Sequence, residues 1–303
     1  MNESRHTNDA GRLRQAVATS VTSRLFTRSS LCGVVLLASL VVCAGCVDFL
    51  SARDRDIQDA TQAIQTAGDS GKRAKAYSAR GVAYSEKARF GWISKQISND
   101  EYKRLFDLAI QDHNQAVALN PEDAQVYFNR AHAYYDRGCQ DLIYNPQPWI
   151  VPPSSKSWLD AAALDFEKAA EMDPKNDMAL DLLGLAYEQA GEEDKAVRAY
   201  TQEMALNPLG KQRLADAYCF FGFRHQQQKE YVSAAAAYQK SIEFGVADDK
   251  SCPYEPVASM VGIYVETREY DQAWKAVHQA QKAGRWIAPE LIERLKKQSG
   301  RAY

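Results

Sequence analysis

The sequence of 303 residues contains none of the short motifs that carry enzyme chemistry. It has only five histidines, and none of them stands in an HExxH pattern or at ligand spacing from a cysteine or carboxylate. A Gly-rich dinucleotide loop, a nucleophile elbow and a protein-kinase signature are also absent. The formal net charge of -2 lacks the basic excess of nucleic-acid-binding proteins. We therefore expect neither an enzyme, nor a cofactor or metal protein, nor a nucleic-acid partner, and no small-molecule substrate is evident.

Cysteine is scarce outside the N-terminal region. Three cysteines lie in or beside one apolar run there, and three are scattered over the rest of the chain: Cys32, Cys43 and Cys46 in the first group, Cys139, Cys219 and Cys252 in the second. The second group shows no CxxC or CxxH spacing, so it indicates neither a zinc site nor a disulfide framework. We expect buried or free thiols, with a bridge between Cys139 and Cys252 as an open alternative.

The N-terminal region carries one charge-free apolar run, residues 31–45, with the sequence LCGVVLLASLVVCAG. Five arginines come before it: Arg5, Arg12, Arg14, Arg24 and Arg28. A positive segment followed by an apolar run too short for a comfortable membrane span is typical of a signal peptide. The run ends in Cys43-Ala44-Gly45-Cys46, which resembles the bacterial lipobox, where small residues precede a cysteine that becomes lipidated.

The lipobox resemblance implies cleavage before Cys46 and a lipid on that residue. We therefore predict a lipoprotein signal peptide over residues 1–45, and a lipidated N-terminus with a short tether over residues 46–52. An uncleaved signal anchor, a transit peptide and a buried core helix remain alternatives. Several acyl chains would hold the chain firmly, because each buried CH₂ contributes roughly 0.8 kcal/mol. Val47 in place of Asp favours the outer membrane, so we expect an envelope protein facing the periplasm.

The stretch Asp177–Leu209 has the pattern of two short amphipathic helices separated by a turn at residues 191–193. Its first half places four residues at the spacing i, i+3, i+4 and i+7 of one helical face: Leu180, Leu183, Gly184 and Tyr187. In its second half Ala196 and Tyr200 are four apart, and Pro208 ends the helix. The small residues let two helices approach closely while the large ones fill the space around them.

This pattern resembles the tetratricopeptide repeat (TPR), in which a large residue, Leu, Gly and Tyr are followed by Ala, an aromatic residue and Pro. Related patterns recur in phase along the chain, over residues 74–123, 124–176, 177–210, 215–248 and 254–287. A helix over residues 53–67 looks like a half-repeat, and an amphipathic helix over residues 289–299 looks like a cap. The resemblance implies an all-α helix-turn-helix solenoid over residues 53–303.

Two of the repeats are longer than the motif. The first has sixteen extra residues, around Arg89–Tyr102, and the second has nineteen in the equivalent place. We expect both inserts to leave the solenoid between the two helices of their repeats, at the same edge. Four prolines predict an extended path for the second insert: Pro146, Pro148, Pro152 and Pro153. Its apolar residues between these prolines form a candidate docking loop: Trp149, Ile150 and Val151. The alternative to a docking role is that this insert folds over the edge of the groove and shields it.

In TPR proteins the first helix of each repeat lines a concave binding surface. The basic clamp that some of them use for a chaperone's C-terminal carboxylate is absent, because Ser78, Met178 and Leu182 occupy its basic positions. An apolar strip with acidic residues around it, Asp181, Glu188 and Asp216, indicates a groove for a peptide or amphipathic helix with apolar anchors and basic character. The candidate groove residues are Phe128, His132, Tyr135, Met178, Leu185 and Phe223. The alternative is that these aromatics only pack between repeats.

The sequence thus predicts a membrane-tethered adaptor that binds a protein or peptide partner in the bacterial envelope. The family resemblance implies a scaffold and not a catalyst, and no cofactor. A second hypothesis is a regulatory or substrate-presenting subunit of an envelope enzyme, with the inserts contributing to that enzyme's site.

Overall fold

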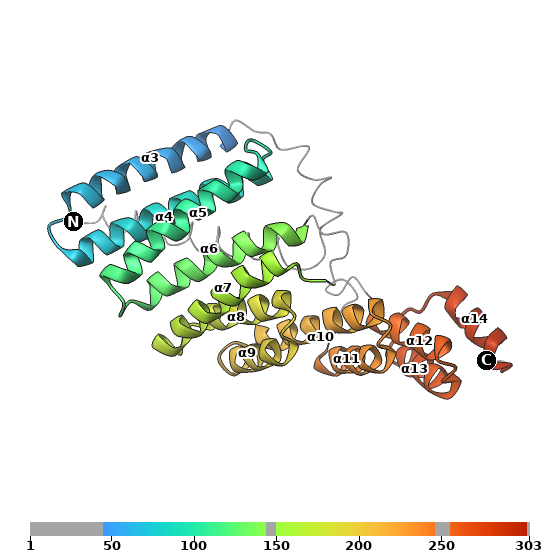
Figure 1. Ribbon diagram of the computed structural model, residues 1–303. Helices are drawn as coiled ribbons and strands as arrows, with labels where there is room; N and C mark the ends of the chain where they lie inside the picture. The colour runs from blue at the N-terminus through green and yellow to red at the C-terminus, as the bar shows by residue number, and fades with distance from the viewer. Residues whose placement is uncertain (1–44, 144–149, 246–254, 302–303) are drawn as a thin grey trace, which may run out of the picture. The chain divides into compact units, whose positions relative to one another are not determined.

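The computed structural model describes residues 45–143, 150–245 and 255–301, which all belong to one compact unit. Every regular element in these ranges is an α-helix (Figure 1). The first six helices are α3 (Gly45–Thr66), α4 (Ser70–Ile93), α5 (Asn99–Leu119), α6 (Ala124–Ile143), α7 (Pro153–Met172) and α8 (Asp177–Ala190). The next six are α9 (Glu193–Leu206), α10 (Leu209–Gln227), α11 (Tyr231–Phe244), α12 (Pro256–Glu266), α13 (Tyr270–Lys282) and α14 (Pro289–Ser299).

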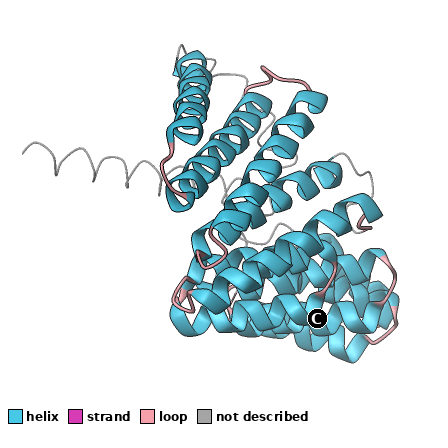
Figure 2. Cartoon of the chain, turned by 60° about the vertical axis from the view of Figure 1, so that its left-hand side comes forward, coloured by secondary structure: helices cyan, strands magenta, loops and turns pink. Residues whose placement is uncertain are grey.

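Consecutive helices pack against one another, as the ladder of neighbouring helices in Figure 2 shows. The even-numbered helices α4 to α14 also contact each other in sequence, so they line one side of the stack. We call this side the first-helix face, because these helices open the repeats. The arrangement confirms the predicted all-α solenoid, including the capping helix α14 over Pro289–Ser299.

The two helices of a repeat meet where a small residue faces a ring. A Cβ added to Gly184 would lie 2.4 Å from Cε1 of Tyr200, and one added to Gly222 would lie 2.7 Å from Cδ1 of Tyr238. In the first repeat a histidine takes the place of the ring, and Gly81 faces His113 in the same way. Close packing leaves no room for a side chain at these glycines, so the motif positions hold the fold together.

The turn between α8 and α9 follows from two residues at the ends of α8. The side chain of Asn176 accepts a hydrogen bond from the Ala179 amide at 3.1 Å and caps the helix N-terminus. Gly191 ends α8 in the left-handed conformation, with φ of 85°. Helix α9 ends at Leu206, as the proline at 208 predicts. The next helix differs from expectation, because α10 begins at Leu209 and not at Ala215.

The extra residues of the first two repeats lie largely in longer helices, so the connections between the paired helices are shorter than predicted. Helix α4 runs on to Ile93 and α5 begins at Asn99, so only residues 94–98 connect them. The extra residues stay helical because they have partners: the rings of Trp92 and Tyr102 lie 5.9 Å apart, and Tyr102 is buried. In the second repeat only residues 144–152 connect the helices, and residues 144–149 lie outside the described part.

The N-terminal helix α3 begins at Gly45, so the predicted short tether over residues 46–52 lies within this helix. The ring of Phe49 lies 4.1 Å from that of Phe90 on α4, and the guanidinium of Arg53 lies over Phe49 at 4.8 Å. These contacts hold the first turns of α3 against α4. Residues 1–44, with the predicted signal peptide, lie outside the described part. None of the helices in the described ranges is long and apolar enough to span a membrane.

Candidate functional site

Three of the six candidate groove residues lie inside the core. Phe128, Tyr135 and Leu185 are exposed by only 8%, 7% and 5%. The ring of Phe128 meets that of Phe166 on the paired helix edge-on, with 5.7 Å between centroids. The prediction of an exposed apolar strip is therefore wrong at these positions, because their side chains pack between helices.

The other three candidates lie nearer the surface, in different surroundings. Nδ1 of His132 lies 3.2 Å from Oδ2 of Asp136 one turn further along α6. Met178, at the start of α8, is exposed, and Phe223 on α10 is half-buried. Of the predicted strip, Met178 alone presents a well-exposed apolar side chain.

Polar contacts between neighbouring first helices take the place of the apolar strip. Nε of Arg89 on α4 lies 3.1 Å from Oδ2 of Asp136 on α6, and both side chains are nearly buried. Burial opposes ionisation of Asp136, but Arg89 and His132 outweigh it and lower the pKa of this carboxyl. The amide of Asn129 donates to Oγ of Ser78 at 3.0 Å across the same pair of helices. The first-helix face is therefore closed by paired polar groups along α4 and α6.

The predicted acidic residues are also engaged. The carboxylate of Asp181 on α8 forms a bidentate pair with Arg213 on α10, at 2.8 Å from Nε and 2.9 Å from Nη2. Glu188 is fully buried and accepts a hydrogen bond from the Tyr200 hydroxyl at 3.1 Å. Asp216 accepts one from the side-chain amide of Gln212 at 3.0 Å. These carboxylates hold helices together, and only part of their charge reaches the surface.

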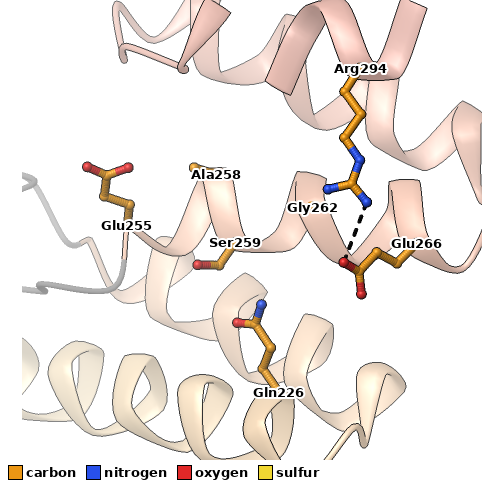
Figure 3. A pocket seen from close by; sticks show the side chains of 7 residues that line it. All are labelled: Gln226, Glu255, Ala258, Ser259, Gly262, Glu266 and Arg294. Atoms are coloured by element: carbon orange, nitrogen blue, oxygen red, sulfur yellow. Dashed lines mark ion pairs between the residues drawn. The ribbon is translucent and has the colours of Figure 1, made fainter. Parts of the chain in front are cut away.

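An open hollow lies at the C-terminal end of the first-helix face. Its cavity volume is about 360 Å³, and α10, α12 and α14 contribute its walls (Figure 3). The lining residues are Gln226, Glu255, Ala258, Ser259, Gly262, Glu266 and Arg294. The sequence reading missed this site because the motif is weakest in the last repeat. The available signal was the run of small residues on one side of α12.

Polar groups surround the small residues of this hollow. Nη2 of Arg294 lies 3.5 Å from Oε1 of Glu266, the contact drawn dashed in Figure 3. The Tyr238 hydroxyl donates to Oε1 of Gln226 at 2.9 Å, which fixes the orientation of that amide. A Cβ added at Gly262 would meet no heavy atom within 4 Å. The floor of the hollow is therefore open space that a ligand can enter.

The predicted docking loop is described only in part. Trp149 lies outside the described residues. Ile150 is 50% exposed, whereas Val151 packs against the core of the middle repeats. One apolar side chain is thus accessible at the connection between α6 and α7.

Two of the scattered cysteines are described, and they differ in redox state. Cys139 is a buried free thiol, and burial raises its pKa. Its free state excludes the alternative bridge between Cys139 and Cys252. Cys219 is disulfide-bonded, which corrects the expectation of a thiol there.

Comparison with known proteins agrees with this architecture. The chain is an all-α helical solenoid of the TPR type. A family described as "TPR repeat" matches residues 106–138, which include most of α5 and most of α6. The match therefore joins the second helix of one repeat to the first helix of the next.

One relative is the "Protein CTR9 homolog" of Arabidopsis thaliana, 24% identical over an alignment of 169 residues that covers 53% of this chain. The chain spans only 15% of that relative's length. Among solved structures, the S. pombe nuclear import adaptor Nro1 superposes with a TM-score of 0.53 at 12% identity, over 82% of this chain and 91% of that chain. A thermophilic TPR protein of Thermus thermophilus matches 69% of this chain and 99% of that chain at 17% identity, with a TM-score of 0.35.

Proposed function

We propose that this protein is an adaptor that captures a protein partner on its first-helix face, close to a bacterial membrane. The observation that carries the proposal is the open hollow at α10, α12 and α14, on a face whose remaining polar groups are largely paired. A solenoid that keeps one part of this face open, with chemically distinct groups around it, is suited to hold a peptide segment. The similarity to a nuclear import adaptor is consistent with the same use of the fold.

Site-specific photo-crosslinking in intact cells tests the adaptor role. A photoreactive amino acid at Met178 or at Glu266 reports on the first-helix face. The matched control is Val232, which is 84% exposed on α11 in the other layer of helices. We expect a crosslinked protein at one or both of the first positions and not at Val232. Equal crosslinking at all three positions, or none at any, would contradict the proposal.

The membrane part of the proposal rests on the lipobox-like ending at Cys46. The disulfide at Cys219 supports a location outside the cytosol, because such bonds persist in oxidising compartments. Metabolic labelling with a fatty acid tests the anchor. We expect Cys46→Ser to lose the label and to leave the membrane fraction, while Cys32→Ser keeps both. Label retained in Cys46→Ser would refute lipidation at this residue.

The second candidate function is a regulatory subunit of an envelope enzyme that docks through the connection between α6 and α7. Exposed Ile150 is the observation that favours it. Ile150→Asp changes this side chain without altering either helix. Loss of partner crosslinks in Ile150→Asp, with Glu266→Ala unaffected, would favour this second function over the first.

A further inference from the structure

The hollow at the C-terminal end of the first-helix face extends along α12. Its lining follows α12 from Glu255 to Glu266, eleven positions apart. At a helical rise of about 1.5 Å per residue, this corresponds to roughly 16 Å. An extended chain advances about 3.3 Å per residue, so about five residues of an extended peptide match this length. The volume of about 360 Å³ lies at the lower end of ligand cavities, which suits a short segment.

The floor of the hollow favours close approach by a backbone. Ala258, Ser259 and Gly262 form one side of α12, and the space over Gly262 is empty for at least 4 Å. Beside them stands Gln226, whose oxygen already accepts from the Tyr238 hydroxyl. Its amide nitrogen therefore remains to donate to a carbonyl, and Figure 3 shows this side chain reaching from α10 toward α12. A peptide carbonyl is the complementary group.

The charges of the hollow differ at its two ends. Arg294 and Glu266 pair with each other at one end. Glu255, at the other end, is exposed and forms no ion pair in the ranges that the structure describes. With two carboxylates and one guanidinium, the lining carries a formal charge of −1. The hollow thus favours a cation near Glu255.

From this geometry we infer that the hollow binds an extended peptide of about five residues with a lysine or arginine facing Glu255. Small side chains of the peptide lie over Gly262, and one of its carbonyls accepts from the amide nitrogen of Gln226. The inference rests on the proposed adaptor function and names the chemistry of its partner. The peptide belongs to a partner protein with an accessible basic segment.

Selection from a library of phage-displayed random heptapeptides tests the inference on the purified full chain. Two variants probe the site: Glu255→Lys reverses the charge, and Gly262→Phe fills the open floor where no atom opposes a new side chain. The matched control is Glu243→Lys, an exposed charge reversal on α11 in the other layer. Circular dichroism checks that each variant keeps its helices.

We expect enrichment of Lys or Arg at one peptide position for the parent chain and for Glu243→Lys. Glu255→Lys should shift that position to Asp or Glu, and Gly262→Phe should lose enrichment. By fluorescence polarisation with the most enriched peptide, Glu255→Lys should weaken binding by at least about threefold, as expected for one exposed ion pair. Gly262→Phe should weaken it by more than about tenfold, because it removes the space for the backbone.

Enrichment without a basic position, binding that Gly262→Phe leaves unchanged, or no enrichment at all would overturn the inference. The adaptor function is decided separately, by the crosslinks at Met178 and Glu266 in intact cells. Crosslinks there without peptide selectivity would leave an adaptor that recognises a different chemistry. If neither crosslinks in cells nor peptide enrichment is found, both the adaptor function and the peptide-binding inference are refuted.

Discussion

His113 is the buried ring of the first repeat, and its replacement should change how stability depends on pH. Its side chain faces Gly81 and is 1% exposed, and its Nδ1 has no hydrogen-bond partner. Burial, with a smaller effect from nearby Arg130, lowers the pKa of this imidazole from 6.5 to about 3. In the unfolded chain this imidazole therefore binds a proton below about pH 6.5, whereas in the folded chain it stays neutral down to about pH 3. Stability falls with decreasing pH throughout this window.

The loss of stability at pH 5 depends only on the pKa of the imidazole in the unfolded chain, because His113 of the folded chain is still neutral at that pH. The unfolded imidazole is about 1.5 pH units below its pKa, and each unit corresponds to about 1.4 kcal/mol. Protonation of the unfolded chain at pH 5 therefore costs the native state about 2 kcal/mol relative to pH 7.5. His113→Phe should abolish this contribution. The ring of Phe166 already occupies the equivalent position of the second repeat.

Urea unfolding followed by circular dichroism at pH 7.5 and pH 5.0 measures the effect. The parent chain should lose about 2 kcal/mol more than His113→Phe between the two pH values. The control is His278→Phe. His278 is exposed and its ring stacks on Trp274, and the phenylalanine ring can make the same stacking contact. Other groups contribute alike to all three chains, such as Glu203, whose pKa burial raises to about 8. An equal loss in the parent chain and in His113→Phe would refute the assignment of a neutral buried histidine.

Two further predictions concern packing. Gly184→Ala should destabilise the fold by about 1–3 kcal/mol, because the new Cβ would lie 2.4 Å from the ring of Tyr200. Gly262→Ala should instead stabilise the fold by up to about 1 kcal/mol through its higher helix propensity, because the new Cβ would meet no heavy atom within 4 Å. In urea unfolding, the midpoints of the two variants should therefore move in opposite directions. The Cys139 thiol, buried and with a raised pKa, should react with a maleimide only after unfolding, and labelling of the folded protein at this residue in mass spectra would contradict its burial.

The fold could be predicted because its determinants are local. A small residue and a ring, such as Gly184 and Tyr200, lie sixteen positions apart in one helical hairpin, so their spacing is visible in the sequence. The extra residues of the first two repeats could not be assigned by motif length. A loop inserted between two helices and a pair of longer helices can contain the same number of residues. The contact between the rings of Trp92 and Tyr102 stabilises the longer helices.

The site was less predictable, because exposure depends on partners that are distant in sequence. Phe128 occupies a motif position that faces outward in a short repeat, but here Phe166 helps to bury it. Arg89 and Asp136 pair across 47 positions, and no pattern in the sequence links them. The hollow on α12 needed the packing of three helices from different repeats before its open floor at Gly262 became apparent.

The contact between Phe49 and Phe90 has a mechanical consequence for the lipid anchor that we propose at Cys46. Phe49 lies three positions after Cys46, which in helical form is a rise of on the order of 5 Å. A flexible linker of tens of residues would let the solenoid explore a radius of roughly 5–6 Å times the square root of its length. Without such a flexible linker, an acylated chain would be held at the bilayer surface with its first helix against the headgroups. It would then meet partners in two dimensions, and those lying within one solenoid length of the membrane would be the ones it can reach.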